Sequence, residues 1–302
     1  MRKGKSLDLG GRVALVAPCG PLRRDRLPAV RRLLESKGYE MRSFLPGRPL
    51  PYLAGKDEER RRLFLSAWKN PGVGFLLVAR GGYGASRTLE GFSARDFAKG
   101  EPKLLCGFSD VTALLNFLAD RAKVICLHGP NASGLLMASP ATKNSFWRAV
   151  IGKTGKGSVL ARGLKASGPS VTGRLAGGNL TVLASLVGTP FEVPLAGKIL
   201  FLEDVNEDLY RLDRSLTQLR QGGDLGKVRA VVLGSFHDGR NRKIPPSKMA
   251  ALVADRLPLR VPIATGLAVG HYGTNLTLPV GAKVRLNSRN GTLVLLEDVV
   301  KN

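Results

Sequence analysis

The sequence predicts an α/β protein with two domains of unequal size. Its first half alternates short apolar runs with segments of helical periodicity, which is typical of a mostly parallel sheet with helices on both faces. The chain of 302 residues is 43% hydrophobic, enough for one large or two ordinary cores. Glycine and proline then interrupt the pattern, which predicts a connector. We therefore place a first domain at 1–138, a connector at 139–170 and a smaller domain at 171–302.

The first domain is predicted to hold strands and helices in alternation. An apolar run with two valines, 12–18, ends at Pro18 and a Cys-Gly-Pro turn, which indicates a buried first strand. Three acidic residues open the segment 56–69, where carboxylates favour the start of a helix. Such a sheet places its site at the carboxyl ends of its strands. The expected elements after the first strand are a helix at 27–37, strands at 39–45 and 73–79, helix 56–69, strands at 104–106 and 124–127, and a helix that starts at Ser109.

The second half is predicted to continue with shorter strands and more turns. A glycine pair, Gly177-Gly178, follows its first strand and precedes an apolar helix. The sequence contains no evident internal repeat. The expected elements are strands at 171–175, 198–202, 228–233, 263 and 292–296, with helices at 180–187, 209–219 and 248–255.

The chain is strongly basic, with 47 Lys and Arg against 23 Asp and Glu. Three interpretations of this charge are open: the protein binds nucleic acid, its electric field attracts an acidic small substrate, or its surface is simply basic and solvated. The basic residues are scattered, with no tail, no repeated module and few aromatic residues. We therefore expect no nucleic-acid partner.

Other bulk features predict a cytoplasmic protein with reduced thiols. No apolar run approaches the ~18 residues of a membrane span, and no apolar segment follows the basic N-terminus. We expect no membrane partner and no export. Cys19, Cys106 and Cys126 are far apart, lie in apolar segments and lack the spacing of metal ligands, which indicates buried free thiols and no metal site.

The segment 104–118 carries the main candidate for chemistry. A short apolar run ends at Gly107, Ser109 follows, and apolar residues of helical spacing begin at once, including Val111 and Leu114. A serine at a turn between strand and helix presents its hydroxyl beside backbone N–H groups that can stabilise an oxyanion. The alternative is that Ser109 only caps the helix.

Three further patterns supply possible partners. The glycine loop 80–84 follows a strand and could donate backbone N–H groups to an anion, or could be an ordinary turn. Each histidine, His128, His237 and His271, follows an apolar run, and His271 lies in the most loop-like setting. Glu203 ends a buried strand, where an acid can orient an imidazole. Glu207 and Asp208 fit the first turn of the next helix better.

Six motifs then occur in one order along nearly the whole chain. Together they resemble the LD-carboxypeptidase family, serine peptidases that include murein tetrapeptide carboxypeptidases and microcin C self-immunity peptidases. The chain lacks Gly-x-Ser-x-Gly, which fits a lineage separate from the α/β-hydrolases. The motifs are Val16-Ala17-Pro18, Arg80-Gly81-Gly82-Tyr83-Gly84, Gly107-Phe108-Ser109-Asp110-Val111-Thr112, Gly177-Gly178-Asn179-Leu180, Leu202-Glu203-Asp204-Val205-Asn206-Glu207, and the segment from Gly270-His271 to Gly281.

The resemblance implies a serine carboxypeptidase with a flavodoxin-like N-terminal domain and its site at the domain interface. It implies Ser109 as nucleophile, Glu203 as acid and His271 as base. The matched motifs also place Asp110 and Gly82 at the oxyanion hole, with Gly81 and Tyr83 at the substrate.

The implied reaction releases the terminal D-alanine of a murein tetrapeptide at an L–D bond, in peptidoglycan recycling. It needs no metal or organic cofactor, and the family resemblance suggests a homodimer. The alternatives are a microcin C-type peptidase that cleaves an acyl-sulfamoyl adenylate or related amide, and a non-catalytic nucleic-acid-binding protein. The glycine loop and the run 202–213 look more like the muropeptide branch.

Overall fold

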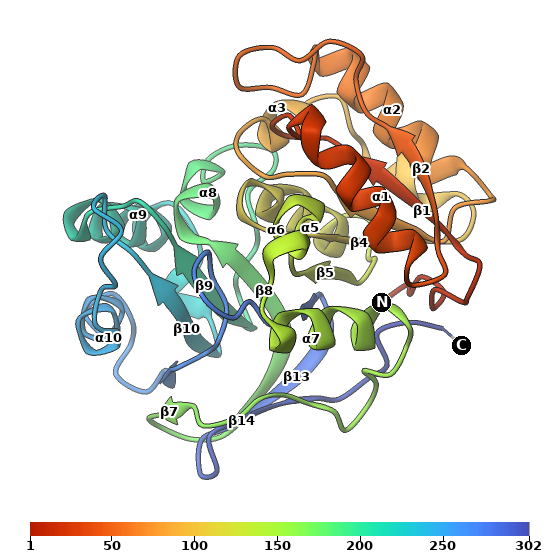
Figure 1. The fold of residues 1–302 in the computed structure, drawn as a ribbon. Helices are drawn as coiled ribbons and strands as arrows, with labels where there is room; N and C mark the ends of the chain where they lie inside the picture. Colours follow the sequence, from red (N-terminus) through yellow and green to blue (C-terminus); the bar gives the residue numbers. More distant parts are fainter. Residues whose placement is uncertain (302) are drawn as a thin grey trace.

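The computed structural model describes residues 1–301 and builds them around two sheets (Figure 1). The first sheet has six strands, five of them parallel. The sixth lies at one edge, is antiparallel and comes from the C-terminal half. Its central strands are buried along their whole length, as expected for parallel strands covered on both faces. In sheet order the strands are β12 (Leu278–Val280), β5 (Cys126–His128), β4 (Leu104–Gly107), β3 (Phe75–Val78), β1 (Arg12–Val16) and β2 (Glu40–Phe44).

Seven helices accompany this sheet. Helix α1 contacts α6, while α3 contacts both α2 and α5. Aromatic side chains fix part of this packing, since Phe146 of α7 lies 6.0 Å from Phe75 of β3. The helices are α1 (Leu27–Glu35), α2 (Asp57–Lys69), α3 (Ala85–Leu89), α4 (Ala94–Ala98), α5 (Thr112–Asp120), α6 (Ala132–Met137) and α7 (Pro140–Val150), and short 3₁₀ helices span Arg24–Arg26 and Ser109–Val111.

The second sheet has eight strands in a mixed arrangement. Its centre is parallel, from β8 to β11, and antiparallel strands extend it at both edges. In sheet order the strands are β6 (Val159–Ala161), β14 (Thr292–Leu295), β13 (Lys283–Asn287), β8 (Val171–Asn179), β9 (Lys198–Asp204), β10 (Ala230–Phe236), β11 (Ile263–Thr265) and β7 (Lys165–Ala166). Its helices are α8 (Leu180–Ser185), α9 (Leu209–Gln221) and α10 (Pro246–Ala254), with a 3₁₀ helix at Leu225–Lys227.

The predicted α/β fold is confirmed, with one correction in its second half. We expected shorter strands there, but β8, β9 and β10 are the longest strands of the chain, with nine, seven and seven residues. The apolar pattern stops early because glycine or polar residues end β8 and β9 and interrupt β10 before Phe236. In β8 the glycine pair Gly177-Gly178 is part of the strand and not a turn.

The segment 139–170 is more structured than its composition indicates. It contains α7 and the edge strands β6 and β7, so it contributes to the packing of both halves. The domain limits themselves stay a prediction.

Helix α5 joins the two halves of the molecule. We expected one buried face, but eight of its nine residues are buried. The reason is that α5 contacts β4 and β5 on one side and β8 and α8 of the second half on the other. The helix that follows Ser109 is therefore the centre of the contact between the halves (Figure 1).

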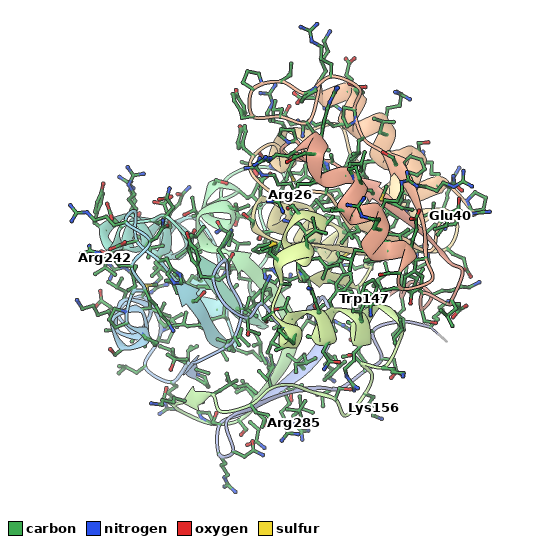
Figure 2. All side chains as sticks on the ribbon, in the orientation of Figure 1. Arg26, Glu40, Trp147, Lys156, Arg242 and Arg285 are labelled. Atoms are coloured by element: carbon green, nitrogen blue, oxygen red, sulfur yellow. The ribbon has the colours of Figure 1, made fainter. Side chains whose placement is uncertain are left out.

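All three cysteines are buried and free, as predicted. Charged side chains such as Arg26, Lys156, Arg242 and Arg285 project from all parts of the surface in view (Figure 2). Within residues 1–301, no helix is both long and apolar enough to cross a membrane.

Candidate active site

Ser109 lies in a strained turn at the end of β4. Its φ is 67°, in the left-handed region, which costs a residue with a side chain about 1 kcal/mol or more. Surrounding contacts hold this turn in place. The side-chain oxygen of Asn131 accepts from the N–H of Phe108 at 3.1 Å, and the carboxylate of Asp110 accepts from the N–H of Ala85 at 2.8 Å.

His271 and Glu203 meet Ser109 across the contact between the halves. Nε2 of His271 lies 3.0 Å from Oγ of Ser109, and Nδ1 of His271 lies 2.8 Å from Oε2 of Glu203. Glu203 is the second-last residue of β9 and is fully buried, while His271 follows Gly270 in a loop. The alternative in which Ser109 caps the helix finds no support, because its hydroxyl faces His271.

The predicted glycine loop lies against Ser109. A Cβ on Gly81 would come 3.0 Å from Cβ of Ser109, so a side chain at position 81 would press on the nucleophile candidate. Gly82 has a φ of 96°, which favours glycine. Tyr83 is 47% exposed, and its ring lies 5.9 Å from that of Tyr52.

A buried cation holds this loop in position. Nη1 of Arg60 donates to the carbonyl of Gly84 at 2.9 Å and also to the carbonyl of Pro18, and Nη2 pairs with Asp57. The guanidinium therefore ties the loop after β1 to the loop after β3. A buried arginine with this many acceptors is well suited to fix loop carbonyls.

A second network connects the serine helix to the acid strand. The N–H of Asn179 donates to Oγ1 of Thr112 at 3.0 Å, and its side-chain amide donates to Oδ1 of Asp204 at 2.8 Å. Asp204 also accepts from the N–H and the hydroxyl of Thr181. Thr112 is three residues from Ser109 and Asp204 adjoins Glu203, so this network sets the distance between the two halves of the site.

The glycine pair makes this close approach possible. A Cβ on Gly178 would overlap with Oγ1 of Thr112, and one on Gly177 would overlap with the carbonyl of Phe201. The amide of Asn116 exchanges two hydrogen bonds with the backbone of Gly177, at 2.9 and 3.1 Å.

The ionisable groups of the site influence one another. Burial disfavours the charged imidazole of His271, but the charge of Glu203 and its hydrogen bond outweigh burial and raise the pKa of His271. Burial, with the charge of Glu203 as second cause, raises the pKa of Asp204 to about 6. Burial also raises the pKa of Asp110. A base with a raised pKa beside a hydroxyl is suited to accept its proton. Among the described residues, no group of three or more His, Cys, Asp or Glu side chains is arranged to hold a metal ion.

The other candidate residues lie nearby but do not join this chain of contacts. His128 is fully buried, with its ring 5.9 Å from that of Phe108. The His237 ring lies 4.6 Å from that of Tyr272. Glu207 precedes α9 and does not form its first turn as expected, because the helix begins at Leu209; its carboxylate pairs with Arg211 of that helix at 3.8 Å.

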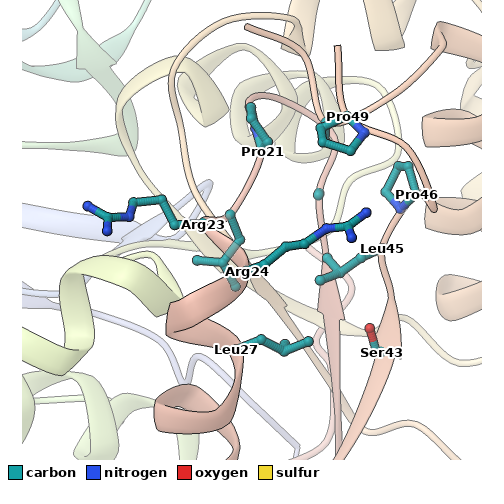
Figure 3. Close-up of a pocket in the computed structure, with 11 residues that line it drawn as sticks. Pro21, Arg23, Arg24, Leu27, Ser43, Leu45, Pro46 and Pro49 are labelled. Carbon is teal, nitrogen blue, oxygen red and sulfur yellow. The ribbon is translucent and has the colours of Figure 1, made fainter. Parts of the chain in front are cut away.

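A separate cavity lies beside the first half of the site. It has a volume of about 330 Å³, and Arg24 extends along it between apolar side chains (Figure 3). Its wall includes Pro21. The preceding residue, Gly20, donates its N–H to the carbonyl of Gly81 at 2.9 Å. None of Ser109, Glu203 and His271 lines it.

Sequence reasoning missed the residues that support the site. Arg60 occurs in a run of charged helix residues, and its one distinguishing signal is that it lies four and seven residues before Phe64 and Ala67, on the buried face of α2. Asn131 lies just after a strand, and that position is the signal that could have marked it; Asn179 and Asp204 each end a strand and belong to the matched motifs, but no role could be assigned to them from sequence.

Comparison with known proteins places the chain in a family. Residues 13–129 match the sequence model for the LD-carboxypeptidase N-terminal domain, and residues 172–286 match the model for the LD-carboxypeptidase C-terminal domain. A putative carboxypeptidase of Streptomyces coelicolor is 37% identical, over 95% of this chain and 93% of its own length. The murein tetrapeptide carboxypeptidase of Pseudomonas aeruginosa is 34% identical, over 90% and 92%.

Solved structures agree with this result. A muramoyltetrapeptide carboxypeptidase from Oxalobacter formigenes has a TM-score of 0.83 and 32% identity, covering 96% of this chain and all of that one. The microcin C7 self-immunity protein has a TM-score of 0.87 with full coverage of both chains, but its 22% identity shows the fold alone. Matches to both halves of the chain, in order, show that this protein is a carboxypeptidase that belongs to the LD-carboxypeptidase family.

Proposed function

We propose that this protein removes the terminal D-alanine from murein tetrapeptides, at the bond between an L-centre and D-alanine. The observation that carries the proposal is the continuous contact from Ser109 through His271 to Glu203, at 3.0 and 2.8 Å. Relatives named murein tetrapeptide and muramoyltetrapeptide carboxypeptidases, at 34% and 32% identity, support the choice of substrate.

In the proposed reaction Ser109 is the nucleophile. Its Oγ attacks the carbonyl carbon of the third peptide residue while Nε2 of His271 takes the hydroxyl proton. Glu203 holds Nδ1–H of His271 and stabilises the imidazolium. The tetrahedral intermediate then collapses, the C–N bond breaks, and His271 gives its proton to the amine of D-alanine. Water hydrolyses the acyl-enzyme, with His271 again as base, and the tripeptide leaves.

The oxyanion hole is proposed at the two backbone N–H groups that flank the serine. Asp110 follows Ser109 at the start of the 3₁₀ helix, and Gly82 belongs to the loop that touches Ser109. Backbone donors held in place before the reaction stabilise developing charge without reorganisation. Gly81 and Tyr83 would then contact the substrate beside the attacked carbonyl.

The test is hydrolysis of a disaccharide tetrapeptide, followed by mass spectrometry. We expect loss of one alanine from the wild type and no loss with Ser109→Ala. Aspartyl sulfamoyl adenosine serves as the competing substrate, because the microcin C7 self-immunity protein has been solved with that compound. Cleavage of the adenosine compound with an intact tetrapeptide would contradict the proposal, and so would alanine release by Ser109→Ala.

The proposed setting is peptidoglycan recycling in the cytoplasm, by a homodimer. These points rest on the family resemblance and on the composition, and light scattering and cell fractionation would test them. The third residue of the tetrapeptide can be diaminopimelate or lysine in this proposal. The net charge of +24 would attract a substrate with several carboxylates, so kcat/KM should fall as salt rises.

A further inference from the structure

A group of buried polar atoms surrounds the acid of the site. Within residues 1–301, eight buried side-chain atoms have no hydrogen-bond partner in the protein; two belong to Trp68 and His237, and the other six belong to Glu203 and four further residues. We call these last five residues the rear cluster. They are Glu203 (Oε1), His128 (both ring nitrogens), Ser235 (Oγ), Asn275 (Nδ2) and Thr277 (Oγ1). Buried polar atoms are nearly always paired, with protein or with water, so such a concentration in one place needs an explanation.

The rear cluster lies directly beside the catalytic candidates. The His128 ring is 4.9 Å from that of Phe201, which is on the same side of β9 as Glu203. It is also 5.9 Å from the ring of Phe108, which in turn is 4.8 Å from the ring of His271. His128 therefore packs against both strands that lead to the site.

The remaining members lie against the chain neighbours of His271 and His128. The hydroxyl of Ser235 lies under Gly270, the neighbour of His271, where a Cβ would overlap with it. Thr277 approaches Gly129, the neighbour of His128, where a Cβ would lie 2.8 Å from its hydroxyl. The side-chain oxygen of Asn275 accepts from the N–H of Gly270 at 3.3 Å, which leaves its NH₂ group available.

Donors and acceptors in the rear cluster are complementary. Oε2 of Glu203 faces His271, so Oε1 needs a donor of its own, and a carboxylate oxygen can only accept. A neutral His128 has one N–H to donate and Asn275 has two. Burial lowers the pKa of His128 to about 4, against the opposing charge of Glu203, so the ring is neutral at pH 7. The other ionisable groups that act on these residues are His271, Asp204 and His237.

We propose that His128 is a positioning residue for the carboxylate of Glu203. Its N–H and the amide of Asn275 hold Oε1 through a shared buried water, which keeps Oε2 aimed at His271. Polar buried spaces with several partners are where proteins retain such waters. This inference rests on the proposed roles of Glu203 and His271 in the reaction.

The consequence is a measurable change in the pH profile. Loss of the donor on Oε1 destabilises the carboxylate of Glu203. The destabilisation is larger after His271 has lost its proton, when the carboxylate stands alone, than before, when it is paired with the imidazolium. The apparent pKa of His271 should therefore rise. We expect His128→Leu to shift the acidic limb of kcat/KM upward by about one pH unit, and to lower kcat about tenfold with KM nearly unchanged.

Two variants make the test specific. His128→Gln keeps an amide donor and should recover most of the shift and of kcat. Cys126→Ala removes a buried side chain from the same strand and should leave the acidic limb where it is. An unshifted limb in His128→Leu, or equal effects of Leu and Gln, would overturn the proposal. If His128→Leu does not fold, Asn275→Leu removes the other donor and is judged by the same shift.

A substrate-free measurement separates this proposal from the proposed function. The proton between His271 and Glu203 should give a low-field NMR resonance, which should move in His128→Leu and return toward its wild-type position in His128→Gln. A wild type that releases no D-alanine would refute the proposed function alone. A resonance that stays unchanged in both variants would refute the role of His128.

Discussion

The two halves of the molecule hold their parts of the site by different means. Ser109 is fixed locally, by a strand, a strained turn and a helix that are continuous in sequence. Glu203 and His271 are 68 residues apart and lie on separate elements, so their 2.8 Å contact depends on the packing of the whole second half. The nucleophile candidate is thus preorganised within the first half, by its own backbone and by the bonds of Asn131 and Asp110, while its base is preorganised by the packing of the second half.

The largest loss of activity should come from removing the reacting side chain that either half supplies. We expect Ser109→Ala and His271→Ala each to lower kcat by roughly 10⁴-fold or more. The hydroxyl and the imidazole act in the same step, so the loss of either one stops that step. The double variant should be hardly worse than either single one. The measurement is D-alanine release at saturating tetrapeptide.

Glu207→Ala serves as the control for this comparison, since its carboxylate pairs with Arg211 beside α9 and not with His271. We expect it to keep most of the wild-type kcat. Effects of the two single variants that multiply in the double variant would show that Ser109 and His271 act independently, contrary to the proposal.

The contact between the halves can be broken without touching a reacting group. Gly178→Ala places a Cβ on Thr112, whereas Gly188→Ala, also at positive φ, meets nothing within 4 Å. We expect Gly178→Ala to cost at least about 2 kcal/mol more in unfolding free energy than Gly188→Ala, because of overpacking. It should also lower kcat more than tenfold, since Thr112 belongs to the helix that follows Ser109.

Urea unfolding and kcat, measured on both variants, check this expectation. Equal costs for the two substitutions would show that the halves can separate at little cost, and that the Thr112–Asn179 contact does not set the geometry of the site.

Much of the first half could be predicted from sequence because its order is local. The strand–serine–helix pattern around Ser109 lies within one stretch, and apolar runs marked β1, β3 and β4 well. The second half was harder, because β8 continues through Gly177 and Gly178, where no apolar side chain marks a strand. Strand β12 was missed because its partner β5 is about half the chain away, and β13 because its alternating pattern was not recognised.

The site shows the same division. Ser109, Glu203 and His271 could be selected from sequence, with the family resemblance deciding among three histidines, and the structure brings these three together. The supporting residues could not be found in this way. Arg60 acts through backbone carbonyls, and carbonyls leave no mark in the sequence. Asn179 matters because it touches two elements that are remote from each other along the chain.

A smaller effect concerns how the second half tunes its base. Glu203 raises the pKa of His271, so the acidic limb of kcat/KM should lie above the usual histidine value of about 6.5. Activity should fall about tenfold per pH unit below that limb, as the imidazole becomes protonated and can no longer accept a proton. Glu203→Gln removes the charge, so the limb should move to lower pH although kcat also falls.

The profile is measured between pH 4.5 and 9 at constant ionic strength, with Asp208→Asn as the control acid substitution. A limb that stays where it is in Glu203→Gln would show that the carboxylate does not raise the pKa of His271, contrary to this prediction.

The smallest effect tests whether the serine turn is strained by its own backbone. Ser109→Ala and Ser109→Gly both lose the bond to His271, but glycine adopts a φ of 67° without penalty. Glycine also makes the unfolded chain more flexible, which cancels part of the gain. We expect Ser109→Gly to be about 1 kcal/mol more stable than Ser109→Ala in urea unfolding. Equal stability would mean that the turn relaxes once the hydroxyl is gone, so that the contact with His271, and not the bonds from Asn131 and Asp110, imposes the conformation. The nucleophile would then depend on the second half as much as its base does.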